Sequence, residues 1–200
     1  MKLIGSPTSP FVRKCVVVAH ELGLTDRIEM IEAATTPLAT APEVIAANPL
    51  GKIPALMRED GPAIYDSRVI TQFLNAEAGA DLYPEAFKWE ILTLEATADA
   101  TMEAAVLMTY EARLRDESAR SQDWVEAQWG KASRALDAVQ DRWMSHLSGP
   151  LNITQIGMAC ALGYIDFRHD ARNWREGRDE LAAWFETFAK RESFTATMPG

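Results

Sequence analysis

Cysteine is scarce in this 200-residue chain, and its two copies, Cys15 and Cys160, form no Cys-x-x-Cys pair. The sequence therefore gives no support for a thiol redox motif or a cysteine-based metal site. Both cysteines fall in apolar helical patterns, so we interpret them as buried, reduced thiols. The three histidines are scattered without the spacing of metal ligands, and we expect no metal.

Long apolar runs and an excess of basic residues are also missing. No apolar run reaches the roughly 18 residues that suggest a membrane span, and Met1–Gly5 lacks the apolar stretch of a signal peptide. The 20 basic residues face 29 acidic ones, which leaves a net charge of −9 and argues against a nucleic-acid-binding surface. We expect a cytoplasmic protein that binds neither nucleic acid nor membrane.

The first 80 residues alternate between strand and helix patterns. A parallel strand pair needs a crossover helix and an antiparallel pair needs only a hairpin, so this order predicts a small mixed sheet of the thioredoxin type. The expected strands are Lys2–Gly5, Ile28–Glu32, Pro54–Arg58 and Ala63–Tyr65, and the expected helices follow Pro10, cover Ala41–Ala47, and run from Ser67 to near Gly79.

Strand patterns end at the linker Ala80–Pro84, and only helical patterns follow. The predicted long helices cover Pro84–Arg115, Ser121–Leu147, Ile153 to about Asp170, and Arg178–Glu192. Asn152 and Gln155 have the spacing of a capping box at the start of the third one. The sequence thus predicts two domains, an α/β domain over residues 1–79 and an all-α domain over residues 84–200.

A proline-containing segment, Asn48-Pro49-Leu50-Gly51-Lys52-Ile53-Pro54-Ala55-Leu56, precedes the third predicted strand. Proline lacks an amide donor, so Pro54 suits the first residue of a strand or a special turn. A cis bond before Pro54 would leave the backbone of Ile53 free to pair with a peptide-like ligand.

Ser9 precedes Pro10 at the start of the first predicted helix. Pro10 fits the first helical turn, which makes Ser9 the natural N-cap. The same helix end offers free amides and a positive dipole end, which would stabilise a bound thiolate. From these residues alone, a capping hydroxyl and a thiolate-binding hydroxyl both remain open.

These segments, together with Asp66-Ser67-Arg68, resemble the glutathione-binding half of a cytosolic glutathione transferase, and Ser9-Pro10-Phe11 resembles the active-site segment of its serine-type members. The resemblance implies a thioredoxin-like α/β domain followed by an all-α helical bundle. It also implies that Ser9 donates to the glutathione sulfur. The implied glutathione-binding residues are Phe11, Lys52, Ile53, Pro54, Asp66 and Ser67, with capping of the next helix as the alternative role for the last two.

The implied activity is that of a homodimeric, cytoplasmic transferase that conjugates glutathione, its co-substrate, to a small electrophile, as in detoxification. The resemblance places the electrophile pocket near Met102, Val106 and Tyr110. Arg13 is either a ligand-attracting cation or a surface or domain-bridging one. Two alternatives remain: a non-catalytic ligand-binding or regulatory protein of the same fold, or another glutathione-dependent enzyme such as an isomerase, dehalogenase or peroxidase.

Overall fold

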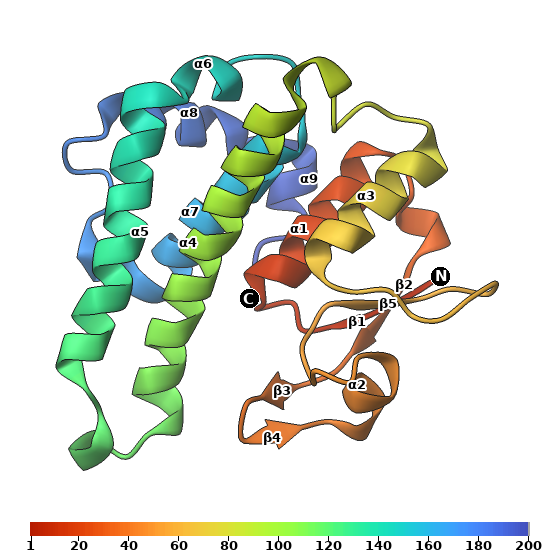
Figure 1. Cartoon of the computed structure of the whole chain (residues 1–200), viewed down its shortest axis with the longest axis horizontal. Coiled ribbons are helices and arrows are strands. Elements are labelled where there is room, and N and C mark those ends of the chain that lie inside the picture. The colour runs from red at the N-terminus through yellow and green to blue at the C-terminus, as the bar shows by residue number, and fades with distance from the viewer. Residues whose placement is uncertain (200) are drawn as a thin grey trace. The chain divides into compact units, whose positions relative to one another are not determined.

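The computed structural model describes residues 1–199, which divide into two compact units (Figure 1). The sheet unit holds Met1–Pro84 and the described residues from Glu192 onward, and the helical unit holds Glu85–Arg191. The predicted order, an α/β part followed by an all-α part, is confirmed. The described residues from Glu192 onward, which the sequence assigned to the helical domain, instead belong to the sheet unit.

The sheet has strand β1 (Lys2–Gly5) at its centre. β2 (Glu29–Glu32) pairs parallel to β1, and β5 (Ala55–Met57) pairs antiparallel on its other side, so the predicted mixed sheet is confirmed. Ile4 lies opposite Ala55, which places Pro54 opposite the end of β1. The loop that follows β1 and the loop that precedes β5 therefore leave the sheet at the same end.

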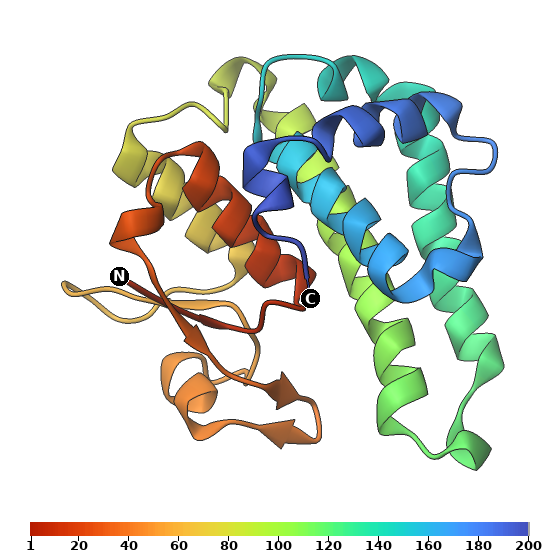
Figure 2. The ribbon, with the colours of Figure 1, turned by 180° about the vertical axis from the view of Figure 1, so that it is seen from behind.

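Helices cover both faces of this sheet. α1 (Pro10–Glu21) and α3 (Ser67–Ala78) lie on one side, and α2 (Pro42–Ala47) lies on the other (Figures 1 and 2). Successive residues of a strand point to opposite faces, so β1 contributes to both layers. Ile4 packs with Val44 of α2, and Leu3 is likewise buried.

One predicted strand is wrong. Residues 63–65 form no strand, and only Ile64 pairs with Leu56, through two backbone hydrogen bonds of 2.9 Å each. The pairing is confined because Pro62 has no amide to donate and α3 begins at Ser67. A short hairpin that the sequence did not predict lies earlier in the chain, formed by β3 (Thr35–Thr36) and β4 (Ala39–Thr40).

The helical unit is built on a long helix, α4 (Lys88–Leu114), which packs against α5 (Gln122–Arg142) and α7 (Ile153–His169). The two remaining α-helices of this unit are α6 (Met144–Leu147) and α8 (Asp179–Phe188). α7 is buried almost all round, as expected of a helix at the centre of a bundle. The predicted helix over 121–147 is divided at Trp143, which ends α5 and precedes α6.

The predicted capping box at the start of α7 is confirmed. The Gln155 side chain accepts a hydrogen bond of 2.8 Å from the Asn152 amide, and Asn152 Oδ1 accepts one of 3.0 Å from the Thr154 amide. The Gln155 amide group also donates to the Leu147 carbonyl at 2.8 Å. The cap therefore fixes both the start of α7 and the end of α6.

The last helix, α9 (Glu192–Thr195), packs against α1 (Figure 2). Arg13 is buried; it donates to the Phe194 carbonyl at 2.9 Å, and its guanidinium lies 3.7 Å from the centre of the Phe194 ring. Ser193 also donates to the Glu21 carboxylate. Arg13 is therefore a packing residue of the sheet unit, and its interpretation as a surface cation is wrong.

No helix within residues 1–199 is long and apolar enough to cross a membrane. The same residues contain no group of three or more histidine, cysteine, aspartate or glutamate side chains placed to hold a metal ion.

Candidate functional site

Ser9 occupies the N-cap position of α1, with extended backbone angles (φ −82°, ψ 126°). Its Oγ accepts a long hydrogen bond of 3.4 Å from the Val12 amide, and its own amide donates to the Ser6 carbonyl at 3.0 Å. A hydroxyl group has one proton to donate besides its acceptor lone pairs. Within residues 1–199 no acceptor is found for the Ser9 proton, and the side chain is only half-buried.

The loop before β5 contains the expected cis bond between Ile53 and Pro54. Asn48 is buried and orders this loop: its Nδ2 donates to the Lys52 carbonyl at 2.8 Å, and its Oδ1 accepts from the Leu50 amide at 3.0 Å. Neither the amide nor the carbonyl of Ile53 is hydrogen-bonded within the described part of the chain. The sequence analysis assigned no role to Asn48. The available sequence signal was an asparagine directly before Pro49, because an asparagine side chain often forms a turn with the backbone two residues further on.

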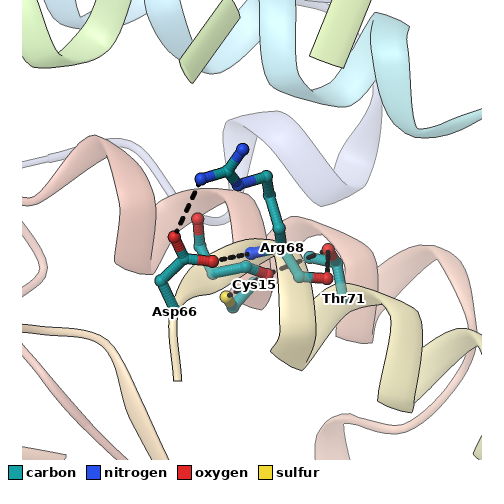
Figure 3. A network of polar contacts seen from close by, with 5 residues as sticks. Cys15, Asp66, Arg68 and Thr71 are labelled. Atoms are coloured by element: carbon teal, nitrogen blue, oxygen red, sulfur yellow. Dashed lines mark hydrogen bonds and ion pairs between the residues drawn. The ribbon is translucent and has the colours of Figure 1, made fainter. Parts of the chain in front are cut away.

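Asp66, and not Ser67, is the N-cap of α3 (Figure 3). Asp66 Oδ1 accepts from the Arg68 amide at 3.0 Å, and Oδ2 lies 3.3 Å from Arg68 Nη2. Ser67 is the first residue of the helix and is 2% exposed. Its hydroxyl has no hydrogen-bond partner among the described residues. The expectation that Ser67 caps α3 is therefore wrong, and the unpredicted partner of Asp66 is Arg68.

The pKa of Asp66 lies below its ordinary value. Burial raises this pKa, but the hydrogen bonds and charge of Arg68 and the charge of Lys14 together lower it by more. Lys14 lies on α1 and is fully buried. Asp66 therefore stays ionised at neutral pH and can receive a cationic group.

The Ser67 carbonyl accepts one hydrogen bond from α1 and one from within α3 (Figure 3). Cys15 Sγ donates to the Ser67 carbonyl at 3.9 Å, and Thr71 Oγ1 donates to the same oxygen at 2.9 Å. Cys15 is fully buried, as predicted, and serves in this packing. The N-terminal turn of α3 is thereby fixed against α1.

The remaining predicted residues differ in exposure. Pro54 is buried, Phe11 is half-buried, and Lys52 is exposed. The Lys52 ammonium forms no hydrogen bond or ion pair with residues 1–199. It is therefore available as a surface cation beside the Ile53 loop.

The three residues expected near the electrophile all lie on α4. Met102 is fully buried, whereas Val106 and Tyr110 are half-buried. A cavity of about 270 Å³ lies between α4 and α5. Its lining residues are Ala100, Thr101, Glu103, Ala104, Leu107, Gln128, Lys131 and Ala135.

Comparison with known protein families gives two matches. The family model "Glutathione S-transferase, N-terminal domain" matches residues 8–77, and "Glutathione S-transferase, C-terminal domain" matches residues 122–187. The chain is also 34% identical over 204 aligned residues to the uncharacterized GST-like protein YibF of Escherichia coli (strain K12). That alignment covers 100% of this chain and 98% of YibF.

Two solved structures of a glutathione transferase family member from Pseudomonas fluorescens Pf-5 are also similar. One has bound glutathione, is 39% identical, and gives a TM-score of 0.97 over 100% of this chain and 98% of that chain. The other has bound S-(propanoic acid)-glutathione, is 38% identical, and gives a TM-score of 0.92 over 100% of both chains. The two domain matches and the full-length similarity place this chain in the glutathione S-transferase family.

Proposed function

We propose that this protein is a glutathione transferase that binds glutathione, holds its sulfur as a thiolate beside Ser9, and transfers it to a small electrophile. The observation that carries the proposal is a half-buried hydroxyl with an uncommitted proton at the N-terminus of α1. A helix N-terminus favours an anion because its amides and its dipole both point toward it. The Pseudomonas relative with bound glutathione supports the same ligand for this chain.

The other residues of the sheet unit are suited to the peptide parts of glutathione. The free backbone groups of Ile53 can pair with the cysteinyl residue in the manner of an added strand. The ionised Asp66 carboxylate can receive the γ-glutamyl ammonium, since its oxygens have lone pairs beyond those used by Arg68. Ser67, at the α3 N-terminus, can donate to the γ-glutamyl carboxylate. Lys52 supplies positive charge for glutathione's carboxylates, and Phe11 and Pro54 supply apolar contact.

The chemistry requires only a thiolate held in position. Glutathione releases its thiol proton to solvent, and the thiolate attacks an electrophilic carbon. A sulfur–carbon bond forms, and the leaving group departs with the bonding electron pair or, in an addition, the product takes up a proton. Ser9 is not the nucleophile; it lowers the pKa of the bound thiol by donating to the anion.

Kinetics of Ser9→Ala test the proposal. We expect kcat with dinitrochlorobenzene to fall by roughly 100-fold while the affinity for glutathione changes little, because the lost donor acts on the anion. Ser121→Ala is the matched control, since Ser121 caps α5 through a 3.2 Å bond from the Trp124 amide and should leave kcat unchanged. Equal kcat values for Ser9→Ala and Ser121→Ala would remove Ser9 from the mechanism.

The test also separates the alternatives. Glutathione binding without turnover over a broad electrophile panel would favour a non-catalytic binding or regulatory protein. Turnover in isomerase, dehalogenase or peroxidase assays alone would assign another glutathione-dependent enzyme. We also propose a cytoplasmic homodimer, by analogy with the family; sedimentation equilibrium should give twice the 22.2 kDa chain mass, and a monomer alone would contradict it.

A further inference from the structure

We propose that the cavity between α4 and α5 is a binding site for a small aromatic carboxylate, held by the side-chain amide of Gln128 and the ammonium of Lys131. All the residues that line this cavity belong to the helical unit. The site is therefore independent of glutathione, because it needs no group of the sheet unit. We call it the α4–α5 site.

One face of each of two packed helices forms the walls of the α4–α5 site (Figures 1 and 2). Residues three, four and seven apart share a helical face. This spacing holds for the lining residues of α4, which include Ala100, Glu103, Ala104 and Leu107, and for those of α5, which are Gln128, Lys131 and Ala135. At the roughly 30 Å³ that one water occupies in the liquid, the cavity has room for a molecule of about nine non-hydrogen atoms.

Gln128 brings an unsatisfied donor to the wall of this cavity. The residue is 1% exposed, and its Oε1 accepts a hydrogen bond of 3.3 Å from Lys131 Nζ. Its Nε2 is buried and has no hydrogen-bond partner among the described residues. The reverse orientation of the amide would set Nε2 against the Lys131 ammonium, donor against donor. A buried donor without an acceptor is unfavourable, and a ligand oxygen at Nε2 would remove that cost.

The charge beside this donor favours an anionic oxygen. Lys131 is exposed, forms no ion pair within residues 1–199, and has two ammonium protons besides the one given to Gln128. A carboxylate has two oxygens, so it can accept from both side chains at once. Glu103, on α4, is also exposed and opposes such a ligand, but only through solvent-screened repulsion.

The remaining lining favours an apolar, flat body for the ligand. Ala100, Ala104 and Ala135 are small side chains that leave the gap between the helices unfilled. Leu107 adds an apolar wall, and Thr101 spends its hydroxyl proton on the Thr97 carbonyl at 2.8 Å. An aromatic ring can pack against these methyl groups while its carboxylate reaches Gln128. Binding sites of this kind are mostly apolar, with a few placed polar groups.

Titration with phenylacetate, followed by ¹H–¹⁵N NMR of the Gln128 side-chain amide, tests this proposal. Phenylacetamide is the neutral probe of the same shape. We expect wild-type protein to bind phenylacetate about fivefold more tightly than phenylacetamide, and the Gln128 amide signal to shift on binding. Gln128→Met keeps a side chain of similar size without the donor, and should weaken phenylacetate binding about tenfold.

Two exposed residues of the α4–α5 site separate charge from shape. Lys131→Gln should reduce the preference for phenylacetate over phenylacetamide to about one, because the cation is gone. Glu103→Gln removes the opposing charge and should tighten phenylacetate binding by about twofold. Arg134→Gln is the matched control for Lys131→Gln, since it removes an exposed cation of α5 that does not line the cavity. It should keep the wild-type preference.

The two surface variants keep the proposal testable if Gln128→Met does not fold. Absence of phenylacetate binding to wild type, or equal affinities for the two probes, would overturn the carboxylate assignment. An equal loss of preference in Arg134→Gln would show a general charge effect and would overturn it as well. A molecular mass that Gln128→Met lowers, with no response to phenylacetate, would show that a second copy of the chain fills the α4–α5 site, and would overturn the small ligand.

Discussion

At the scale of single residues, His169 is a base held in an environment that disfavours its charge. Its Nε2 lies 2.8 Å from the Ala105 carbonyl and 3.1 Å from Thr109 Oγ1. Burial lowers the pKa of His169 most strongly, and the charges of Arg172 and Arg168 lower it further, against the opposing effect of the bond to Ala105. The folded protein therefore binds this proton less readily than the unfolded chain does.

Because the pKa of His169 is lower in the folded protein, the stability of the protein depends on pH. The stabilisation is fully present above the unfolded-state pKa of about 6.5 and is lost as the pH falls through the lower folded-state pKa. Because the imidazole is partly exposed, we expect an effect of roughly a few tenths of a kcal/mol. Urea unfolding measures this at pH 7.5 and pH 5.5, on the order of one unit to either side of that pKa. Between these two pH values, the free energy of unfolding of His169→Gln should fall less than that of wild type.

His20→Gln is the control, because it leaves the contact with Ala105 in place and should keep the wild-type pH dependence. A parallel fall in stability for His169→Gln and wild type would contradict this account of His169.

The site residues show what sequence reasoning can reach at this scale. The fixed φ and missing amide of Pro10 placed Ser9 at a helix start without any structure. The sequence could not show whether Asp66 or Ser67 caps α3, because both residue types are good N-caps. The backbone angles of the folded chain determine which of them is the cap. The contact between Asp66 and Arg68 could not be predicted either, because it depends on the side-chain conformation that brings Arg68 Nη2 to the Asp66 carboxylate.

At the scale of secondary-structure elements, the start of α7 depends on its capping box. Asn152→Ala removes the acceptor of the Thr154 amide and should lower the free energy of unfolding by about 1 kcal/mol. Asn152→Ser retains an oxygen acceptor and should lose less. Urea unfolding of the three proteins measures the difference, and equal stability of Asn152→Ala and wild type would show that the cap contributes nothing.

Element boundaries were predicted where a local signal exists and missed where it does not. The capping box predicted the first residue of α7 because both partners lie within four residues of each other. The break at Trp143 carries no proline or glycine, and the Gln155 side chain fixes the end of α6 from beyond the loop. The second strand of the predicted hairpin does not form, because Pro62 has no backbone amide to donate to the sheet. A pattern of strand-favouring side chains does not register this missing amide.

At the scale of the whole molecule, the C-terminal segment joins the sheet unit through a side chain 181 residues earlier in the sequence. Arg13→Met should remove the bond to the Phe194 carbonyl and cost about 1–3 kcal/mol, the usual cost of an unsatisfied buried polar group. Hydrogen exchange should become faster in α9 and remain unchanged in α4. Arg27→Met, which removes an exposed ion pair with Glu77, should leave α9 protected.

Unchanged exchange in α9 of Arg13→Met would show that the segment is held by other contacts. The domain assignment of this segment could not be predicted, because helical periodicity shows that residues form a helix and not which core the helix joins. Long-range contacts of this kind have no local signal in the sequence.

The central claim is that Ser9 and the α1 N-terminus lower the pKa of bound glutathione. The most direct measurement is the ultraviolet absorbance of the thiolate, titrated against pH with glutathione bound to wild type and to Ser9→Ala. We predict a thiolate that forms well below the free-thiol pKa of roughly 8.5 in wild type and shifts back toward that value in Ser9→Ala. Binding without a lowered pKa in wild type, or the same lowered pKa in Ser9→Ala, would contradict the claim.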